Sequence, residues 1–286
     1  MSGLGGPGNA RMNRHDRSAS GERVRTAVLL AAGLGSRLAP LTDAVPKCMV
    51  SVGGVPILGR LVGCLDGYGF ERLVVVTGYR SEVIRDYLGA RFGGVAVEYV
   101  VSAVFESTNN IYSLWLVRDV VDEAFLLVES DLVFDAELLA LLLRPDRVAV
   151  SRQLPWMSGT TVTVDADGIV DAFYPPPPGI YGAHCSDLDH FMAVNICSLS
   201  RRTWGEVRRR LDQHVAAGQT GTFYESVFAE MTAQGCMAAE AVIFPADRWY
   251  EIDAVVDLRA AEVLFGDRPP AAGDPRRGGI VPGAGG

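Results

Sequence analysis

A run of apolar residues, Val24–Ala31, leads directly into a short segment that contains Gly33 and Gly35. A continuous apolar run of this kind is typical of a parallel strand that is covered on both faces. Because glycine has no β-carbon, the backbone N–H groups of the following loop can close around phosphate oxygens. The segment therefore indicates an α/β fold whose first strand ends in either a phosphate-binding loop or a plain strand-to-helix turn.

Strands and helices alternate over the first half of the chain. Continuous apolar runs indicate buried strands, and apolar residues three and four positions apart indicate amphipathic helices. The next predicted strands are Arg72–Thr77, Val95–Val100, Ala124–Glu129 and Val148–Val150. The predicted helices are Ile57–Asp66, Ser81–Leu88, Ile111–Val117 and Glu137–Leu143. This order predicts an α/β fold with a doubly wound, mostly parallel, Rossmann-like sheet.

The pattern changes near residue 151. Thr160–Val164 and Ile169–Phe173 alternate between polar and apolar residues, and Asp167-Gly168 lies in the connection between them. Asp-Gly between alternating strands is a strong hairpin signal, so we expect a small antiparallel lid insertion over about residues 151–200. The later predicted elements are strands Phe191–Ile196 and Ala238–Phe244 and helices Arg201–Ala216, Tyr224–Ala233 and Val255–Phe265.

The two ends of the chain differ from the part between them. Both are rich in glycine and lack apolar periodicity. Such segments bury too little surface to offset the entropy lost on ordering. We expect disordered tails at residues 1–22 and 266–286, and one folded domain at 23–265.

Charge and composition exclude several classes of partner. With 26 Lys and Arg against 34 Asp and Glu, the formal net charge is −8, which provides no overall attraction for nucleic acid or an anionic membrane. No apolar run approaches the roughly 20 residues of a membrane span, and the start of the chain does not resemble a secretory signal. Five cysteines without CxxC spacing are typical of reduced thiols, so we expect a cytoplasmic protein. The oligomeric state stays open, a homo-oligomer included.

The glycine loop is compatible with several structures. A dinucleotide-binding loop needs G-x-G-x-x-G, but Leu38 occupies the third glycine position. The G-x-x-x-x-G-K-[ST] pattern of a P-loop is absent. A plain strand-to-helix turn would explain the two glycines alone. It would not explain the fixed positive charge of Arg37 and Lys47 or the long R-L-x-P-L-T and P-K pattern, which favours a nucleotidyltransferase loop around a nucleoside triphosphate.

The segment from Ala27 to Thr42, with Pro46-Lys47 after it, resembles the signature of nucleotidyltransferases of the sugar-phosphate and choline-phosphate type. The resemblance continues through residues 53–58, 76–79, 107–114, 129–131 and 249–253. Asn-Asn-Ile-Tyr-Ser-Leu and Tyr-Glu-Ile-Asp resemble the choline-phosphate and phosphonate cytidylyltransferase branch more than the sugar branch. Together these segments span about 24–265, so the resemblance implies the nucleotidyltransferase type of the Rossmann-like fold.

The resemblance implies transfer of CMP from CTP to a small phosphonate or phosphomonoester, with release of pyrophosphate. Arg37 would hold the triphosphate, and Lys47 would bridge the α-phosphate and the acceptor. Asp131 and Asp253 would hold Mg²⁺, which prefers oxygen ligands. We therefore expect Lys47, Arg37 and Asp131 to be catalytic. No general base is required, because such an acceptor is already anionic, and the four histidines form no zinc pattern.

Each acidic position also has a simpler explanation. Asp131 follows a buried strand, where ligands bind in open α/β sheets, but it could cap a helix near Ala136. Asp253 precedes a helix, where an aspartate is a common N-cap, and the residues alone favour that role over metal binding. Glu129 and Glu251 are offset by two positions from the aspartates, so they could share a face with them.

The predicted nucleotide site gathers backbone and small polar groups near the carboxyl edge of the sheet. Asn109 or Asn110 could read a pyrimidine edge, because an amide both donates and accepts hydrogen bonds. Each could equally be an ordinary turn residue. The predicted nucleotide-binding residues are Leu30, Ala31, Ala32, Gly33, Gly35, Ser36, Arg37, Gly78, Tyr79, Asn110 and Ser130.

The acceptor pocket is less constrained. Residues 151–158 contain one tryptophan and no acid, which does not suit the quaternary ammonium of phosphocholine. The basic side chains nearby favour an acceptor with extra negative charge or none. Glu225 could lie near the metal, or be a solvated acid in the first turn of a helix. The predicted acceptor-binding residues are Lys47, Arg152, Trp156, His190, Asn195 and Glu225.

Two other functions remain as hypotheses. The first is a sugar-1-phosphate nucleotidyltransferase that uses UTP, dTTP or GTP. The second is a nucleotide-binding regulator without catalysis, and the presence of Lys47, Asp131 and Asp253 argues against it.

Overall fold

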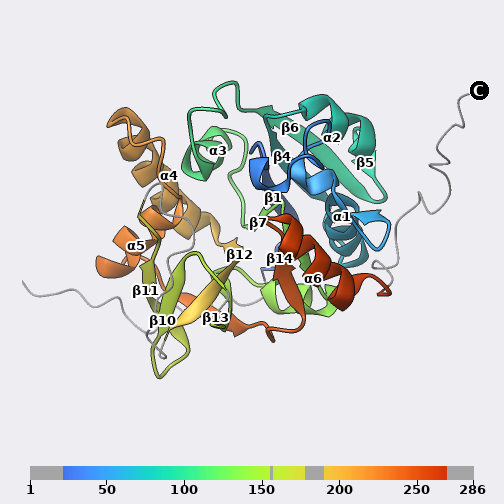
Figure 1. The fold of residues 1–286 in the computed structure, drawn as a ribbon. Helices are drawn as coiled ribbons and strands as arrows, with labels where there is room; N and C mark the ends of the chain where they lie inside the picture. Colours follow the sequence, from blue (N-terminus) through green and yellow to red (C-terminus); the bar gives the residue numbers. More distant parts are fainter. Residues whose placement is uncertain (1–21, 155–156, 178–189, 269–286) are drawn as a thin grey trace, which may run out of the picture.

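The protein is described by a computed structural model that covers residues 22–154, 157–177 and 190–268. Its centre is a ten-stranded sheet with the strand order β10-β11-β13-β9-β12-β7-β1-β4-β6-β5. Helices pack on both faces of this sheet (Figure 1). The predicted α/β class is therefore confirmed.

The half of the sheet built from the first part of the chain is parallel. β1 (Thr26–Ala31) lies between β4 (Arg72–Thr77) and β7 (Phe125–Glu129), and β6 (Val95–Val101) pairs with β4. All residues of β1 are buried, as its unbroken apolar run predicts. Because these strands run in one direction, the carboxyl ends of β1, β4 and β7 meet at one edge of the sheet. A short strand, β5 (Arg91–Phe92), adds antiparallel to β6.

The helices divide between the two faces of the sheet. Side chains of β1 alternate between the two cores, with Leu29 in one and Leu30 in the other. The core that contains Leu29 is covered by α1 (Ile57–Gly67) and α2 (Ser81–Leu88). The core that contains Leu30 is covered by α3 (Asn110–Leu116), α4 (Arg201–Ala216) and α5 (Glu225–Ala233).

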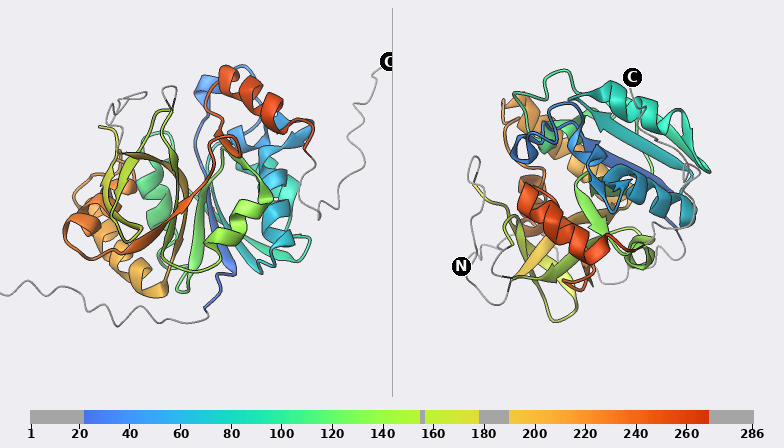
Figure 2. Two further views of the ribbon diagram at one scale, coloured as in Figure 1. Left: turned by 90° about the horizontal axis from the view of Figure 1, so that it is seen from below. Right: turned by 45° about the vertical axis from the view of Figure 1, so that its right-hand side comes forward.

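The other half of the sheet is mainly antiparallel and closes on itself. Its strands are β9 (Arg147–Arg152), β10 (Thr161–Val164), β11 (Ile169–Tyr174), β12 (Phe191–Leu199) and β13 (Ala239–Ile243). Since β10 pairs with both β11 and β12, the pairings form a ring, which Figure 2 shows as a barrel-like part in its left view. The predicted hairpin is confirmed, and it is part of the main sheet because β12 also pairs with β7.

A third, smaller core lies under α6 (Val255–Phe265), the last helix described. It also contains residues of β2 (Ser51–Val52) and β8 (Leu132–Phe134), while β14 (Trp249–Glu251) pairs with β8. Sequence analysis predicted neither β8 nor β14, because three residues are too few to show a period. β3 (Val55–Pro56) was missed for the same reason.

The long elements otherwise lie where the sequence predicts them, and residues 136–142 form a 3₁₀ helix. The tails predicted at residues 1–22 and 266–286 lie almost entirely outside the described residues, so their disorder stays a prediction. Among the helices of the described ranges, none combines the length and apolar character that crossing a bilayer requires.

Candidate active site

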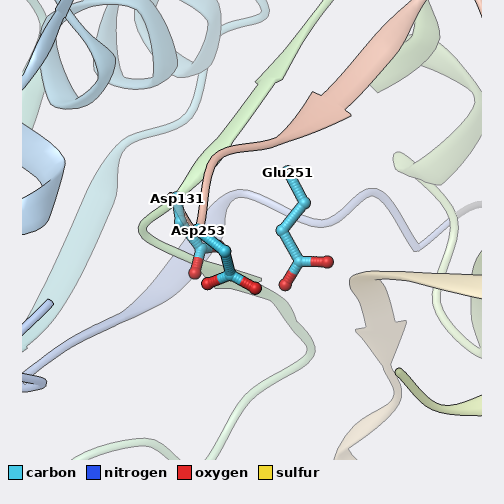
Figure 3. Close-up of side chains that lie close together, drawn as sticks. All are labelled: Asp131, Glu251 and Asp253. Carbon is cyan, nitrogen blue, oxygen red and sulfur yellow. The ribbon is translucent and has the colours of Figure 1, made fainter. Parts of the chain in front are cut away.

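Two acidic segments from distant parts of the chain meet through a short antiparallel pairing. Glu251 of β14 lies opposite Leu132 of β8, and the backbone N–H of Ile252 donates to the carbonyl oxygen of Asp131 at 3.0 Å. Asp253 follows two residues after Glu251. The carboxylates of Asp131, Glu251 and Asp253 therefore gather at one point, beyond the end of β7 (Figure 3).

These three carboxylates can hold a metal ion. One ligand oxygen from each lies within 4.8 Å of the others. Asp131 is only 8% exposed, and its Oδ1 is buried without a hydrogen-bond partner. A set of carboxylate oxygens with an unsatisfied buried oxygen suits a hard divalent cation such as Mg²⁺. Glu251, which sequence analysis placed near the aspartates without a role, belongs to this group.

Two basic side chains reach the same aspartates. The Lys47 ammonium lies 2.7 Å from Asp131 Oδ2 and 2.5 Å from Asp253 Oδ1. An Arg37 Nη2 lies 2.8 Å from the same oxygen of Asp253. The predicted catalytic residues Lys47, Arg37 and Asp131 are thus brought together with Asp253.

Charge at this site is set by competition between burial and pairing. Burial lowers the pKa of Lys47, but Asp131, Asp253 and Glu251 together raise it well above its ordinary value. Burial raises the pKa of Asp253, yet Lys47 and Arg37 outweigh it and hold that pKa below its ordinary value. Lys47 is therefore an ammonium and Asp253 a carboxylate at neutral pH.

Lys47 is the only lysine in the whole sequence, in which the other basic residues are arginines. Arginine presents a wide planar fork, whereas lysine presents a compact charge on a flexible stem. The single lysine lies where a small cation must fit between the buried Asp131 and the partly buried Asp253.

The alternative capping roles of the aspartates do not apply in the structure. The N-cap residue of α6 is Ala254, and Asp257 Oδ2 accepts hydrogen bonds from the backbone N–H of Asp253 at 3.1 Å and of Ala254 at 2.7 Å. The side chain of Asp253 is therefore left for the site. Asp135, rather than Asp131, precedes the 3₁₀ helix at residues 136–142.

The glycine loop is open on one side and tightly packed on the other. Gly35 has a φ of 65°, and a β-carbon there would lie 2.9 Å from Lys47 Cβ. The Thr42 hydroxyl donates to the Gly35 carbonyl oxygen at 2.9 Å and holds this contact in place. A β-carbon at Gly33 would meet no atom within 4 Å, so the loop leaves room for an anion.

The loop is also held from the neighbouring strand. A β-carbon at Gly78 would lie 2.6 Å from the Ala32 carbonyl oxygen, so only glycine allows this approach. The Tyr79 hydroxyl donates to the carbonyl oxygens of Thr42 at 3.1 Å and Asp43 at 2.7 Å. Gly78 and Tyr79 thus shape the loop, and their contact with a nucleotide stays a prediction.

The other predicted nucleotide-binding residues lie along the carboxyl edge of the sheet. Leu30 pairs with Glu129 across β1 and β7, and Ala31 pairs with Thr77 across β1 and β4. These positions place the loop that holds Ala32, Gly33, Gly35, Ser36 and Arg37 beside Gly78, Tyr79 and Ser130. Leu30 and Ala31 are buried, so a ligand would meet the backbone beyond them.

Asn110 holds two elements together. Its Nδ2 donates to Glu129 Oε1 at 3.0 Å, and its Oδ1 accepts from the backbone N–H of Tyr224 at 3.0 Å. Both ends of the amide are therefore engaged, and reading of a pyrimidine edge by Asn110 stays a prediction. Asn109 caps α3, because its side chain accepts from the N–H of Asn110.

The predicted acceptor residues fall into two groups, namely Asn195 and Glu225 in one and His190 and Arg152 in the other. Asn195 Nδ2 lies 3.5 Å from Glu251 Oε1, and Glu225 is 5% exposed. The solvated first-turn position considered for Glu225 is therefore wrong, because α5 packs this side chain inward. His190 contacts the Thr161 hydroxyl at 3.1 Å, and Arg152 is exposed at the end of β9. Trp156 lies outside the described residues.

A hollow beside the carboxylates contains residues that sequence analysis missed. Its lining joins the region after β9 to β12, β14 and the start of α6. Sequence pattern gives no signal for these contacts, because they join segments that are distant in the chain. The lining residues are Met157, Ser158, Met192, Trp249, Glu251, Asp253 and Asp257.

Comparison with known proteins identifies the family of this chain. Residues 26–148 match the family described as nucleotidyl transferase. The UTP–glucose-1-phosphate uridylyltransferase of Haloferax volcanii is 32% identical over 208 residues, which is 68% of this chain and 85% of that protein. The chain belongs to the nucleotidyltransferase family.

Other relatives of this nucleotidyltransferase are more specialised. The CMP-5′-(3-aminopropyl)phosphonate synthase of Streptomyces rubellomurinus is 33% identical over 249 residues. That match covers 84% of this chain, but the chain spans only 38% of that relative's length. The 2-aminoethylphosphonate cytidylyltransferase of Lancefieldella rimae is 38% identical over 112 residues, which is 39% of this chain and 44% of that protein.

A solved structure shows the same fold. The CTP:phosphocholine cytidylyltransferase of Streptococcus pneumoniae superposes with a TM-score of 0.69 at 20% identity. The match covers 85% of this nucleotidyltransferase and 99% of that chain.

Proposed function

We propose that this nucleotidyltransferase transfers CMP from CTP to a small phosphonate or phosphomonoester and releases pyrophosphate. The observation that carries the proposal is the convergence of Lys47, Asp131 and Asp253 beside an open glycine loop. Joining two anions requires cations and positioning more than covalent chemistry, and these residues would supply both.

The choice of cytidine and of the acceptor class is supported by the relatives. One of these relatives is named for making the CMP adduct of an aminoalkyl phosphonate, and another for transferring cytidylate to one. The resemblance of residues 109–114 and 250–253 to the cytidylyltransferase branch agrees with this choice.

The protein's own groups would act on an in-line displacement. An oxygen of the acceptor would attack the α-phosphorus of CTP, and the bond from that phosphorus to the bridging oxygen of pyrophosphate would break. The Lys47 ammonium would neutralise charge on both phosphoryl groups as they approach. Arg37, with half of its side chain exposed, would hold the leaving triphosphate end over the glycine loop. No general base is needed, because the acceptor oxygen is already anionic.

Asp131 and Asp253, with Glu251, are the residues that would hold Mg²⁺. When bound, the ion supplies Lewis-acid stabilisation of the charge that develops on the α-phosphate. The donor set and the unsatisfied Oδ1 of Asp131 support this assignment. In the structure Lys47 occupies the space between the same carboxylates, so we expect Lys47 and the cation to share them.

The test is release of pyrophosphate with Mg²⁺, each of CTP, UTP, dTTP and GTP, and a panel of alkylphosphonates, phosphocholine and sugar 1-phosphates. We expect CTP with a phosphonate to give the highest kcat/KM. A preference for UTP, dTTP or GTP with a sugar phosphate would overturn the cytidine assignment.

A sugar-1-phosphate nucleotidyltransferase is the second candidate. The relative from Haloferax volcanii favours it, because this chain covers 85% of that uridylyltransferase. A nucleotide-binding regulator is disfavoured by the retained Lys47, Asp131 and Asp253, and would be supported by nucleotide binding without pyrophosphate release for any acceptor.

A further inference from the structure

Glu225 is a buried acid with an unused oxygen. It is the first residue of α5, it is 5% exposed, and its Oε2 has no hydrogen-bond partner. Its other oxygen, Oε1, lies 3.5 Å from the Thr160 hydroxyl. Burial raises its pKa to about 7. A buried carboxyl group is costly unless it is paired, so this position calls for a cationic or hydrogen-bond-donating partner.

Glu225 belongs to the lining of a small cavity between α5 and strands β9, β11 and β12. The cavity has room for about one water-sized group, which is also the size of a primary ammonium. Apolar and aromatic side chains form most of its wall. The lining residues are Val148, Phe173, Ala193, Asn195, Ile196, Cys197, Tyr224, Glu225 and Phe228.

Asn195 links this cavity to the carboxylates of the active site. It lines the cavity, and its Nδ2 lies 3.5 Å from Glu251 Oε1. It has a φ of 59° at the point where the pairing of β12 with β9 shifts register. A non-glycine residue in this conformation is held there by its surroundings, because the conformation costs free energy.

A second buried glutamate adds to the negative charge. Glu129 approaches Glu225 closely enough for the two carboxyls to repel, and Asn110 supports Glu129 from one side. Within the described residues, neither Glu129 nor Glu225 forms an ion pair. Burial and mutual repulsion make the two carboxyls hold their protons more strongly, so a cation bound between them would favour their charged forms.

We propose that the Glu225 carboxylate, with Glu129 and Asn195, binds a primary ammonium group on the acceptor, which makes that acceptor an aminoalkyl phosphonate. The proposal rests on the proposed function and names its substrate class. The unused oxygen would accept a hydrogen bond from the ammonium, and the aromatic wall would contact its methylene groups. Sequence analysis named Glu225 as an acceptor-binding residue, but it based its expectation of an acceptor with extra negative charge or none on residues 151–158 and the basic side chains nearby.

A metal ion fits this cavity less well than an ammonium. Among the described residues, the one group of three potential ligands is Asp131, Glu251 and Asp253. Glu129 and Glu225 belong to no such group, and apolar and aromatic side chains form most of the cavity wall.

The experiment compares 3-aminopropylphosphonate with propylphosphonate, which differ in the ammonium group alone. We expect the wild-type protein to favour the amino compound by about 100-fold in kcat/KM, because loss of a partner leaves a buried charge unpaired. Glu225→Gln should reduce this ratio to less than about 5-fold, mainly through the KM of the amino compound. The KM of CTP and the rate with propylphosphonate should change less than about 3-fold.

Glu230→Gln is the matched control, because Glu230 lies on the same helix and contacts His214 instead. It should leave the ratio unchanged. A wild-type ratio near one would overturn the proposal and leave the proposed function intact, and this result does not depend on the folding of any variant. A large ratio that survives in Glu225→Gln would also overturn it. Absence of pyrophosphate release from CTP with every phosphonate and every phosphomonoester would instead refute the proposed function.

Discussion

The ammonium group of Lys47 pairs with the site's aspartates and is also the group that we expect to take part in catalysis. Its ammonium screens two aspartates from each other, and the same charge is the one that we expect to meet the reacting phosphates. Lys47→Ala should lower kcat by about 100- to 1000-fold, as loss of one transition-state donor does in other enzymes. Lys47→Arg should also be impaired, because a guanidinium cannot fit as a compact charge between the carboxylates.

The measurement is pyrophosphate release under saturating substrates, with circular dichroism to show that each variant folds. Metal binding gives a second readout. Lys47→Ala should bind Mn²⁺ or Mg²⁺ more tightly than the wild type, because it removes a charge that competes for Asp131 and Asp253. Wild-type turnover in Lys47→Ala would refute the assigned role.

We expect the free energy of unfolding of the ligand-free protein to depend on pH, because Glu225 is buried. Its pKa is about 7 in the folded protein and near 4.5 in the unfolded chain. The folded state therefore holds the proton more strongly, and stability falls as the pH rises from about 4.5 through about 7. Glu225→Gln removes this loss, so at pH 8 the variant should be more stable than the wild type by about 1–3 kcal/mol.

Urea unfolding at pH 5 and pH 8 measures the difference between the two proteins. Acids that do not interact with Glu225 titrate alike in both proteins and cancel in the comparison. If the variant and the wild type lose stability in parallel between these pH values, Glu225 does not carry the proton.

At the scale of elements, two glycines of the loop have different roles: Gly35 is needed for the backbone conformation, and Gly33 leaves room for a ligand. Gly35→Ala would force a β-carbon to within 2.9 Å of Lys47 Cβ at a positive φ. We expect it to cost about 1–2 kcal/mol of stability and to displace Lys47, which lowers kcat. Gly33→Ala meets no atom within 4 Å, so stability should be unchanged while the KM of CTP rises.

Thermal unfolding and steady-state kinetics of the two variants distinguish these effects. Equal loss of stability in Gly33→Ala and Gly35→Ala would show that the loop is not held against Lys47 as described.

The parts of the site that could not be predicted from the sequence are positioned by short elements. The carboxyl edge of β1 and β7 and the acid at position 131 follow from long apolar runs. The position of Asp253 does not, because it depends on the pairing of β14 with β8 and on the cap that Asp257 provides for α6. Each of these contacts involves a few residues, so neither leaves a periodic pattern.

At the scale of the whole molecule, the candidate metal site joins the first half of the chain to the last helix described. Asp131 follows β7, and Asp253 precedes α6. A ligand that binds only the folded state stabilises it, by about 2.7 kcal/mol at 100 times Kd. Mg²⁺ alone should therefore raise the Tm by several degrees, and Asp131→Asn should abolish this rise.

Differential scanning fluorimetry across a Mg²⁺ titration measures the effect. Asp119→Asn is the control, because Asp119 is largely exposed, pairs with Arg118 and does not belong to the carboxylate group of the site. An equal Tm rise in Asp131→Asn would show that the cation binds elsewhere.

The sequence by itself determined the parallel half of the sheet, the glycine loop and the family of the protein. These depend on local patterns, namely unbroken apolar strands, helical periods and small residues at a turn. Tertiary structure alone decided that the hairpin closes a ring, that Asn110 is engaged with Glu129, and that Glu225 faces inward. The reason is physical: burial and pairing depend on which segments meet in space, and contacts between different elements leave no trace in local periodicity.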